Sequence, residues 1–201
     1  MWSYGRMYGK ALRAASPALC GRKGGKLVRP GRHVSAFVFL GPEHIKSADI
    51  AALHPNIGVV VRDYDDACAA DVAHLLALCK RQRRAVFYAG PAGTAPSGVG
   101  LHVPRWRRIT RAKRTSCSVH SMAEAIRARR AGAHVVFVSP VFPTASHPGA
   151  SPAGLFSARR WAQAAKAACF GLGGITMSNA RQVMAGGLFD GVAGISVFLE
   201  G

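Results

Sequence analysis

The stretch SPVFPTASHPG, residues 139–149, brings small hydroxyl groups and an imidazole together in a loop stiffened by three prolines. Hydroxyls and imidazole nitrogens can hydrogen-bond an anion, and histidine titrates near neutral pH. Proline reduces the entropy that such a loop loses when it orders around a ligand. We therefore predict a loop with Thr144 and Ser146 as substrate-binding residues and with Ser146 and His147 as catalytic candidates. The alternative is a stiff loop whose hydroxyls only cap the next helix or bond their own backbone.

Two glycine-bearing segments near the end of the chain could bind an anion through their backbone. GLGGIT, residues 171–176, has adjacent glycines before a predicted helix, where the absence of Cβ atoms leaves N–H groups accessible. Residues 194–196, GIS, add further N–H groups and a hydroxyl. The phosphate site predicted from these segments consists of Gly173, Gly174, Ile195 and Ser196. The alternative is that the paired glycines only permit close packing of a turn.

The elements that must position these loops follow a regular order. From residue 34 onward, short apolar runs alternate with segments of helical period, which is typical of βα units. Eight runs are expected to be strands: Ser35–Leu40, Ile57–Val61, Ala85–Tyr88, Gly98–Leu101, Thr115–Ser118, His134–Val138, Cys169–Leu172 and Gly191–Ile195. The predicted fold is α/β, a (β/α)8 TIM barrel, in which the loops after all strands meet at one mouth. A doubly wound open sheet is the alternative.

Helix boundaries are marked by capping residues. Helices are expected at Asp66–Arg81, Ser121–Ala131, Ser157–Ala168 and Ser178–Ala185. Ser121 and Ser178 are predicted N-caps, and Glu124 three residues after Ser121 completes a capping-box pattern. Gly132 and Gly186 are predicted helix stops.

The composition predicts one globular domain with a basic extension. The chain has 201 residues, which is near the usual size of one domain. It contains no run approaching the ~20 apolar residues that span a bilayer. Residues 1–32 carry eight Lys and Arg residues and no acid. We predict a flexible basic extension over residues 1–32 and a single TIM-barrel domain over residues 33–201.

The net charge of +18 raises the alternative of a nucleic-acid partner, because clustered cations bind phosphate backbones by releasing counterions. WRRITRAKR, residues 106–114, places Trp106 beside such cations. Basic stretches are nevertheless usually solvated surface. We expect small phosphorylated molecules as partners, and neither nucleic acid nor a membrane. The sequence leaves the oligomeric state open.

The cysteines support neither a disulfide framework nor a zinc site. All five are widely spaced and form no CxxC motif. Free thiols of this kind are typical of a reducing compartment, so we expect a soluble cytoplasmic protein.

Four motifs in the second half of the chain resemble one family. HVVFVSPVFPTASHPG, then PAGL, then GLGGIT followed by NA, then DGVAGIS, are similar to the C-terminal half of the thiamine phosphate synthase/TenI family. The resemblance is specific over residues 115–198 and topological over residues 34–114. It implies a (β/α)8 barrel that couples hydroxymethylpyrimidine diphosphate to a thiazole phosphate and releases diphosphate. In the TenI branch it implies aromatisation of the thiazole phosphate instead.

The resemblance also implies roles for individual residues. Gly174, Ile195 and Ser196 would hold the thiazole phosphate. Thr144 and Ser146 would belong to the loop that closes over both substrates.

The remaining residues carried over lie on other strands. Ser118 would contact the pyrimidine side as a catalytic candidate, and Arg62 would bind substrate. Val60 and Tyr64 replace the polar partners that the family usually places around that arginine. His147 replaces the lysine with which the loop ends in most synthases.

The family's metal ligands are missing from this sequence. Synthases hold Mg²⁺ with aspartates after the third and fourth strands, whereas Glu124 is the only acid in residues 72–189. We assign no metal ligand. Two alternatives stay open: Arg62 and Arg105 replace Mg²⁺, or the cluster at Asp63, Asp65 and Asp66 binds it. A carboxylate cluster before a helix more commonly complements the helix dipole.

The function predicted is therefore a thiamine phosphate synthase-like enzyme. One alternative is a TenI-like thiazole tautomerase, for which His102, His120 and His147 are the proton-transfer candidates. The other alternative is a non-catalytic barrel that binds a thiazole or thiamine phosphate. The missing carboxylates argue against the coupling reaction but not against phosphate binding.

Overall fold

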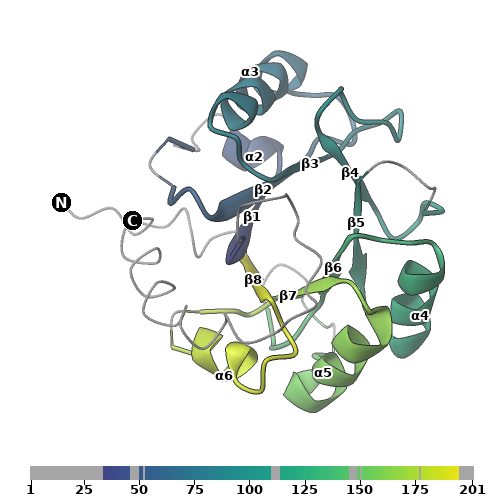
Figure 1. The fold of residues 1–201 in the computed structure, drawn as a ribbon. Coiled ribbons are helices and arrows are strands. Elements are labelled where there is room, and N and C mark those ends of the chain that lie inside the picture. The colour runs from purple at the N-terminus through teal and green to yellow at the C-terminus, as the bar shows by residue number, and fades with distance from the viewer. Residues whose placement is uncertain are drawn as a thin grey trace.

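Eight parallel strands close into a barrel in the computed structural model, which describes residues 34–45, 50–51, 53–109, 114–144, 149, 151–176 and 178–194. Each strand pairs with the next, and β8 pairs with β1 to close the ring (Figure 1). The strands are β1 (Ala36–Leu40), β2 (Ile57–Arg62), β3 (Val86–Ala89), β4 (Gly100–Val103), β5 (Thr115–Val119), β6 (Val135–Val138), β7 (Ala168–Leu172) and β8 (Gly191–Gly194). The TIM barrel predicted from the sequence is confirmed, and the open sheet is excluded.

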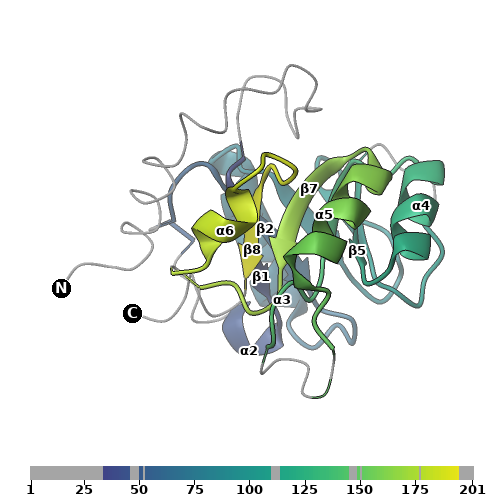
Figure 2. The same cartoon turned by 90° about the horizontal axis from the view of Figure 1, so that it is seen from below.

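Helices surround the barrel unevenly. They are α2 (Pro42–Ile45), α3 (Ala69–Arg81), α4 (Met122–Arg130), α5 (Gly154–Ala165) and α6 (Ala180–Met184). Figure 2 shows α4 and α5 side by side along the strands, where the buried Ala125, Ala128, Ala158 and Ala162 allow close approach. Between β3 and β5, by contrast, the described residues form loops and β4 but no helix (Figure 1).

Aromatic rings fill the interior of the barrel. The ring of Phe37 lies 4.8 Å from that of Phe170, 5.2 Å from that of Phe137 and 5.9 Å from that of Phe87, measured between centroids. The first two contacts are edge-to-face, which aromatic quadrupoles favour. These rings come from four different strands, so they tie opposite walls of the barrel together.

Glycines on neighbouring strands make room for these rings. A Cβ atom on Gly58 would lie 2.3 Å from the Phe37 ring, and one on Gly191 would lie 2.3 Å from the carbonyl oxygen of Ser35. The interior is thus packed with large rings facing residues without side chains, as close packing of a small barrel requires.

The structure corrects several predicted boundaries. β4 begins at Gly100 rather than at Gly98, because Gly98 has a φ of +79° and cannot continue a strand. α5 begins at Gly154 rather than at Ser157, and it ends before Lys166, whose left-handed φ of +49° stops the helix. α3 begins at Ala69 rather than at Asp66, which itself has a φ of +56°.

One predicted cap is confirmed and one is wrong. The Ser121 hydroxyl accepts a hydrogen bond from the Glu124 N–H at 3.2 Å, as an N-cap should. Ser178 is not the cap of α6, which begins after Asn179; its hydroxyl lies 2.9 Å from that of Thr176 instead. Gly132 follows the end of α4 with a φ of +73°, as a helix stop requires.

The predicted basic extension, residues 1–32, lies outside the described residues. Within the part that the structure describes, no helix is long and apolar enough to cross a membrane. The barrel itself accounts for the elements predicted from residue 34 onward.

Candidate functional site

The loops after β6 and β7 lie against each other at the mouth of the barrel. The Val141 N–H donates to the Leu172 carbonyl oxygen at 2.9 Å, and the Phe142 N–H donates to the Gly173 carbonyl oxygen at 3.1 Å. These bonds join the loop after β6 to the glycine turn in the manner of two paired strands. The two segments that the sequence singled out are therefore neighbours in space.

Only glycine can occupy positions 173 and 174 of the turn after β7 without strain. Gly173 has a φ of +89°, and a Cβ atom there would lie 2.8 Å from the Cα atom of Pro140. Gly174 has a φ of +63°, and a Cβ atom there would lie 2.3 Å from the carbonyl oxygen of Pro143. Close turn packing, the alternative considered from the sequence, is therefore one reason for both glycines.

Packing does not occupy the two glycine N–H groups of this turn. Neither the Gly173 N–H nor the Gly174 N–H makes a hydrogen bond with any residue that the structure describes. Asn179 holds the turn from behind, because its side-chain amide donates to the Gly174 carbonyl oxygen at 2.8 Å. Its side-chain oxygen accepts from the Thr176 N–H at 2.8 Å. A turn fixed in this way presents two N–H groups without a reorganisation penalty.

Part of the predicted phosphate site falls outside the described residues. Leu172 pairs with Ala193, so the turn lies beside the end of β8. Ile195 and Ser196, which complete the predicted site, are not among the described residues. The same holds for Ser146 and His147, whereas Thr144 is described and half-buried at the end of the loop after β6.

Arg62 is the last residue of β2 and faces the barrel mouth. Its guanidinium carbon lies 5.4 Å from the centroid of the Phe39 ring, which belongs to the interior. Its Nε is buried and has no hydrogen-bond partner in the described part of the chain. An unsatisfied buried donor on a cation is costly unless a ligand completes it, so Arg62 is suited to an anionic group.

His102 belongs to the barrel interior and not to the loop after β4, where the sequence placed it. The correction follows from the shifted strand, which turns His102 inward to pack against Phe39, with 5.6 Å between ring centroids. Its Nδ1 lies 2.9 Å from the Ser116 hydroxyl oxygen. Burial, with a smaller contribution from Arg62, lowers the pKa of His102 to about 3. His102 is therefore neutral at neutral pH and is not a proton-transfer group there.

We expect His102 to make the protein acid-sensitive. Its folded pKa of about 3 lies below the ordinary value of 6.5. The unfolded chain therefore binds a proton that the folded chain excludes as pH falls from 6.5 towards 3. The stabilisation is complete above pH 6.5 and is lost at ~1.4 kcal/mol per pH unit below it. Between pH 7 and pH 5, urea unfolding should show the wild type losing about 2 kcal/mol more than His102→Asn.

The control for this experiment is His74→Asn on the exposed face of α3. That variant should follow the wild-type pH dependence. Equal pH dependence in wild type and His102→Asn would show that His102 is not the group responsible.

Ser118 and His120 lie at the end of β5. Ser118 pairs with Phe137, and alternation along the strand places it on the interior side with Ser116. The His120 N–H donates to the Glu124 Oε2 at 2.7 Å. Ser118 therefore has the interior position near the mouth that a contact with the pyrimidine side requires, and His120 follows directly after the strand.

Arg105 does not join Arg62, contrary to the alternative in which the two replace a metal. Its Nε donates to the Glu124 Oε1 at 3.0 Å, beside α4. Glu124 is buried and also forms an ion pair with the Arg127 guanidinium, with 3.6 Å between Oε1 and Nη2. A buried carboxylate attracts the nearest cation strongly, which holds Arg105 outside the barrel.

The aspartate cluster after β2 does not form a metal site among the described residues. Asp63 is completely buried, and its two carboxylate oxygens accept from the N–H groups of Ala67 and Cys68 at 3.0 and 3.2 Å. It therefore holds the turn that leads into α3. No group of three metal-ligating side chains occurs anywhere in the described part of the chain.

The described cysteines are free thiols, as the sequence predicted. Cys68, Cys79, Cys117 and Cys169 are all free. Burial raises the pKa of Cys79 to about 11 and that of Cys117 to about 12, so both stay protonated. Cys20 lies outside the described residues.

The sequence did not reveal a cavity on the outer side of β4 and β5. It is lined by Arg105, Arg107 and Arg108 on one side and by α4 on the other. One feature of the sequence could have indicated this cavity. Residues 104–114 lack the helical pattern that a βα unit should have there.

Comparisons with known proteins agree with this architecture. Residues 100–198 match the family described as thiamine monophosphate synthase. A putative thiamine-phosphate synthase 2 of Aquifex aeolicus (strain VF5) is 39% identical over 83 residues, which is 41% of this chain and 44% of that protein. A thiamine-phosphate synthase of Chloroflexus aurantiacus (strain ATCC 29366 / DSM 635 / J-10-fl) is 37% identical over 91 residues, 45% of this chain and 42% of that protein. The matches span less than half of each relative.

The likeness in three dimensions is wider. The structure of a thiamine phosphate pyrophosphorylase from Pyrococcus furiosus has a TM-score of 0.65 and covers 84% of this chain and 90% of its own. Its sequence is 20% identical, so this likeness concerns the fold. The family resemblance predicted from the C-terminal motifs is confirmed.

Proposed function

We propose that this chain, which the match of residues 100–198 relates to the thiamine monophosphate synthase family, binds a thiazole phosphate in the barrel mouth and couples it to hydroxymethylpyrimidine diphosphate. The reaction would make it a transferase of thiamine biosynthesis that releases diphosphate. The observation that carries the proposal is the rigid turn at Gly173 and Gly174, with two N–H groups that no described residue satisfies. Loops after the seventh and eighth strands commonly bind phosphate in such barrels.

Arg62 is the group proposed to receive the diphosphate. A leaving diphosphate carries negative charge that must be stabilised as its bond to the pyrimidine breaks. Arg62 faces the mouth with a buried donor that lacks a partner among the described residues. The apolar rings below it lower the local dielectric and so strengthen its attraction to an anion.

Magnesium is the cation that the family resemblance implies, and the residues described here do not fit a site for it. Both oxygens of Asp63 accept backbone hydrogen bonds, and Glu124 lies beside α4 with two arginines. The proposed reaction therefore assigns no step to a metal. Its charge stabilisation rests on Arg62 and on the backbone of the glycine turn.

A second function, a non-catalytic barrel that binds the same phosphate, is favoured by this lack of free carboxylates at the mouth. Binding needs the glycine turn alone, whereas coupling also needs stabilisation of the leaving group. A tautomerase would need a group that titrates near neutral pH, and His102 does not. His147, together with His120, is then the proton-transfer candidate for that branch.

The decisive experiment is to incubate the full chain with both substrates, with and without Mg²⁺, and to measure thiamine phosphate. We expect product from the wild type, roughly 100-fold less from Arg62→Met, and unchanged product from Arg129→Met on the outside of α4. Thr144→Ala and Ser196→Ala test the predicted phosphate loops in the same assay.

Each negative outcome has a distinct meaning. No product from the wild type would reject the synthase. If thiazole phosphate still raised the melting temperature, the non-catalytic binder would remain. If the ligand caused no rise, both functions would be rejected.

A further inference from the structure

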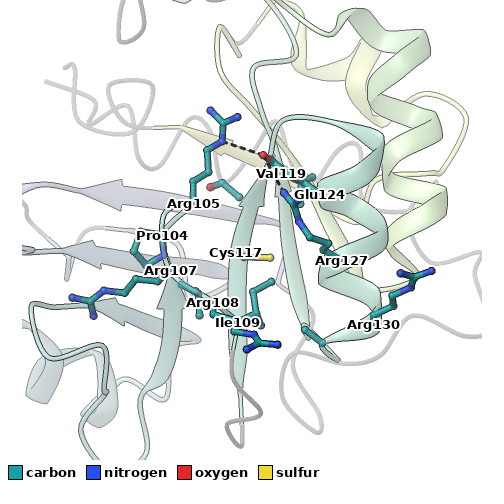
Figure 3. Close-up of a pocket in the computed structure, with 13 residues that line it drawn as sticks. Pro104, Arg105, Arg107, Arg108, Ile109, Cys117, Val119, Glu124, Arg127 and Arg130 are labelled. Carbon is teal, nitrogen blue, oxygen red and sulfur yellow. Dashed lines mark hydrogen bonds and ion pairs between the residues drawn. The ribbon is translucent and has the colours of Figure 1, made fainter.

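The cavity beside β4 and β5 lies on the outer side of the barrel wall, and Ser118 is the one lining residue that it shares with the proposed active site. It has a volume of about 480 Å³ and is bounded by the loop after β4, by β5 and by α4 (Figure 3). Small-molecule sites commonly measure ~300–1,000 Å³. The cavity is therefore large enough for a ligand of the size of a nucleotide.

The missing helix explains why the cavity exists. In a regular (β/α)8 barrel each strand is followed by a helix that covers the outer face of the strands. Here residues 104–109 and 114, the described part of the connection from β4 to β5, are not helical. Among the described residues only α4 covers this side of β5, so a hollow lies over the outer face of β4 and β5.

The floor of the cavity is apolar. It consists of outward-facing strand residues and one loop residue: Val103, Cys117, Val119 and Ile109. The Cys117 sulfur points towards α4 in Figure 3. An apolar floor of this kind favours a hydrocarbon or aromatic body.

The rim of the cavity is strongly cationic. Five arginines line it: Arg105, Arg107, Arg108, Arg127 and Arg130. Glu124 is the one acid among the lining residues, and Figure 3 shows Arg105 and Arg127 converging on it. Positive charge therefore exceeds negative charge around an apolar hollow.

Internal contacts leave much of this charge free. Arg107 is held by the carbonyl oxygens of Gly90 and Pro91. No hydrogen bond or ion pair from Arg108 or Arg130 to another described residue is present. Unpaired guanidinium groups beside a cavity are the side chains best suited to phosphate.

We infer that this cavity binds a small aromatic molecule that carries phosphate, of the nucleotide class, with its ring on the apolar floor and its phosphate at Arg108 and Arg130. Charge complementarity selects this occupant. Residues 1–32 of the chain itself are basic without a single acid, and a second copy would bring a net charge of +18. Both would be repelled by the arginine rim, whereas an anion is attracted.

The test measures binding of ADP to the full chain by calorimetry at 150 mM salt, with adenosine and inorganic diphosphate as comparison ligands. We expect ADP to bind at least tenfold more tightly than either, because each lacks one half of the recognised molecule. Arg108→Gln combined with Arg130→Gln should weaken ADP binding at least tenfold. Arg129→Gln, on the same helix but outside the cavity, should have no effect.

Three outcomes would overturn the inference. The first is equal affinity of the wild type and the double variant for ADP. The second is binding of adenosine or diphosphate as tight as that of ADP. The third is an equal loss of ADP affinity in the Arg129→Gln variant. If a 12-nucleotide RNA also bound more tightly than ADP, the arginines would form an extended nucleic-acid surface instead. Arg62→Met should leave ADP binding intact, so this site and the barrel mouth are tested separately.

Discussion

Replacing Gly174 by alanine should weaken the binding of thiazole phosphate roughly 100-fold, which corresponds to about 2.7 kcal/mol. The new Cβ atom would lie 2.3 Å from the Pro143 carbonyl oxygen and 2.8 Å from the Phe142 Cβ. Backbone atoms cannot rotate away, so the loop after β6 must separate from the turn. A left-handed backbone adds ~1–2 kcal/mol for any residue with a Cβ. Calorimetric titration with thiazole phosphate measures the effect.

Gly132→Ala is the matched control for this prediction. Gly132 has a similar φ of +73°, and a Cβ atom there meets nothing within 4 Å. It follows α4 and is separate from the glycine turn. The control variant should lose a little stability and keep its affinity. Equal losses of affinity in the two variants would show that backbone strain, and not the contact between the two loops, is responsible.

Replacing Arg84 by methionine should lower the free energy of unfolding by about 3 kcal/mol, because hydrogen bonds to a buried charged group are worth ~1.5–3 kcal/mol. Arg84 is almost fully buried after α3. Its Nη1 donates to the carbonyl oxygens of His54 and Ile57 at 2.7 and 3.2 Å. Its Nη2 donates to those of Ile50 and Leu53 at 3.0 and 2.6 Å. Methionine would leave these carbonyls without their donor.

Urea unfolding of Arg84→Met, Arg84→Lys and Arg83→Met checks this prediction. Lysine keeps the charge but cannot reproduce the planar fork, so it should recover only part of the stability. Arg83 is exposed and adjacent, and its replacement should change the free energy by less than ~0.5 kcal/mol. Equal stability of Arg84→Met and Arg83→Met would show that the four carbonyl contacts do not stabilise the fold.

The sequence by itself determined the features that depend on neighbouring residues. Alternating apolar runs predicted eight strands and the barrel, and Ser121 predicted the start of α4. The meeting of the loop after β6 with the turn at Gly173 and Gly174 was also predictable. Parallel strands in one barrel must end at the same edge, so the order of the strands fixes which loops are neighbours.

Only the tertiary structure decided where individual polar side chains point. A shift of two residues in β4 moved His102 from a loop into a strand and so into the barrel, where it is neutral. Asp63 binds the backbone of the turn before α3 and is not free to act as a metal ligand. Arg105 moved to the outside because Glu124, nineteen residues later, is buried there. Such partners are set by strand register and by contacts between distant segments, and a local pattern carries no information about either.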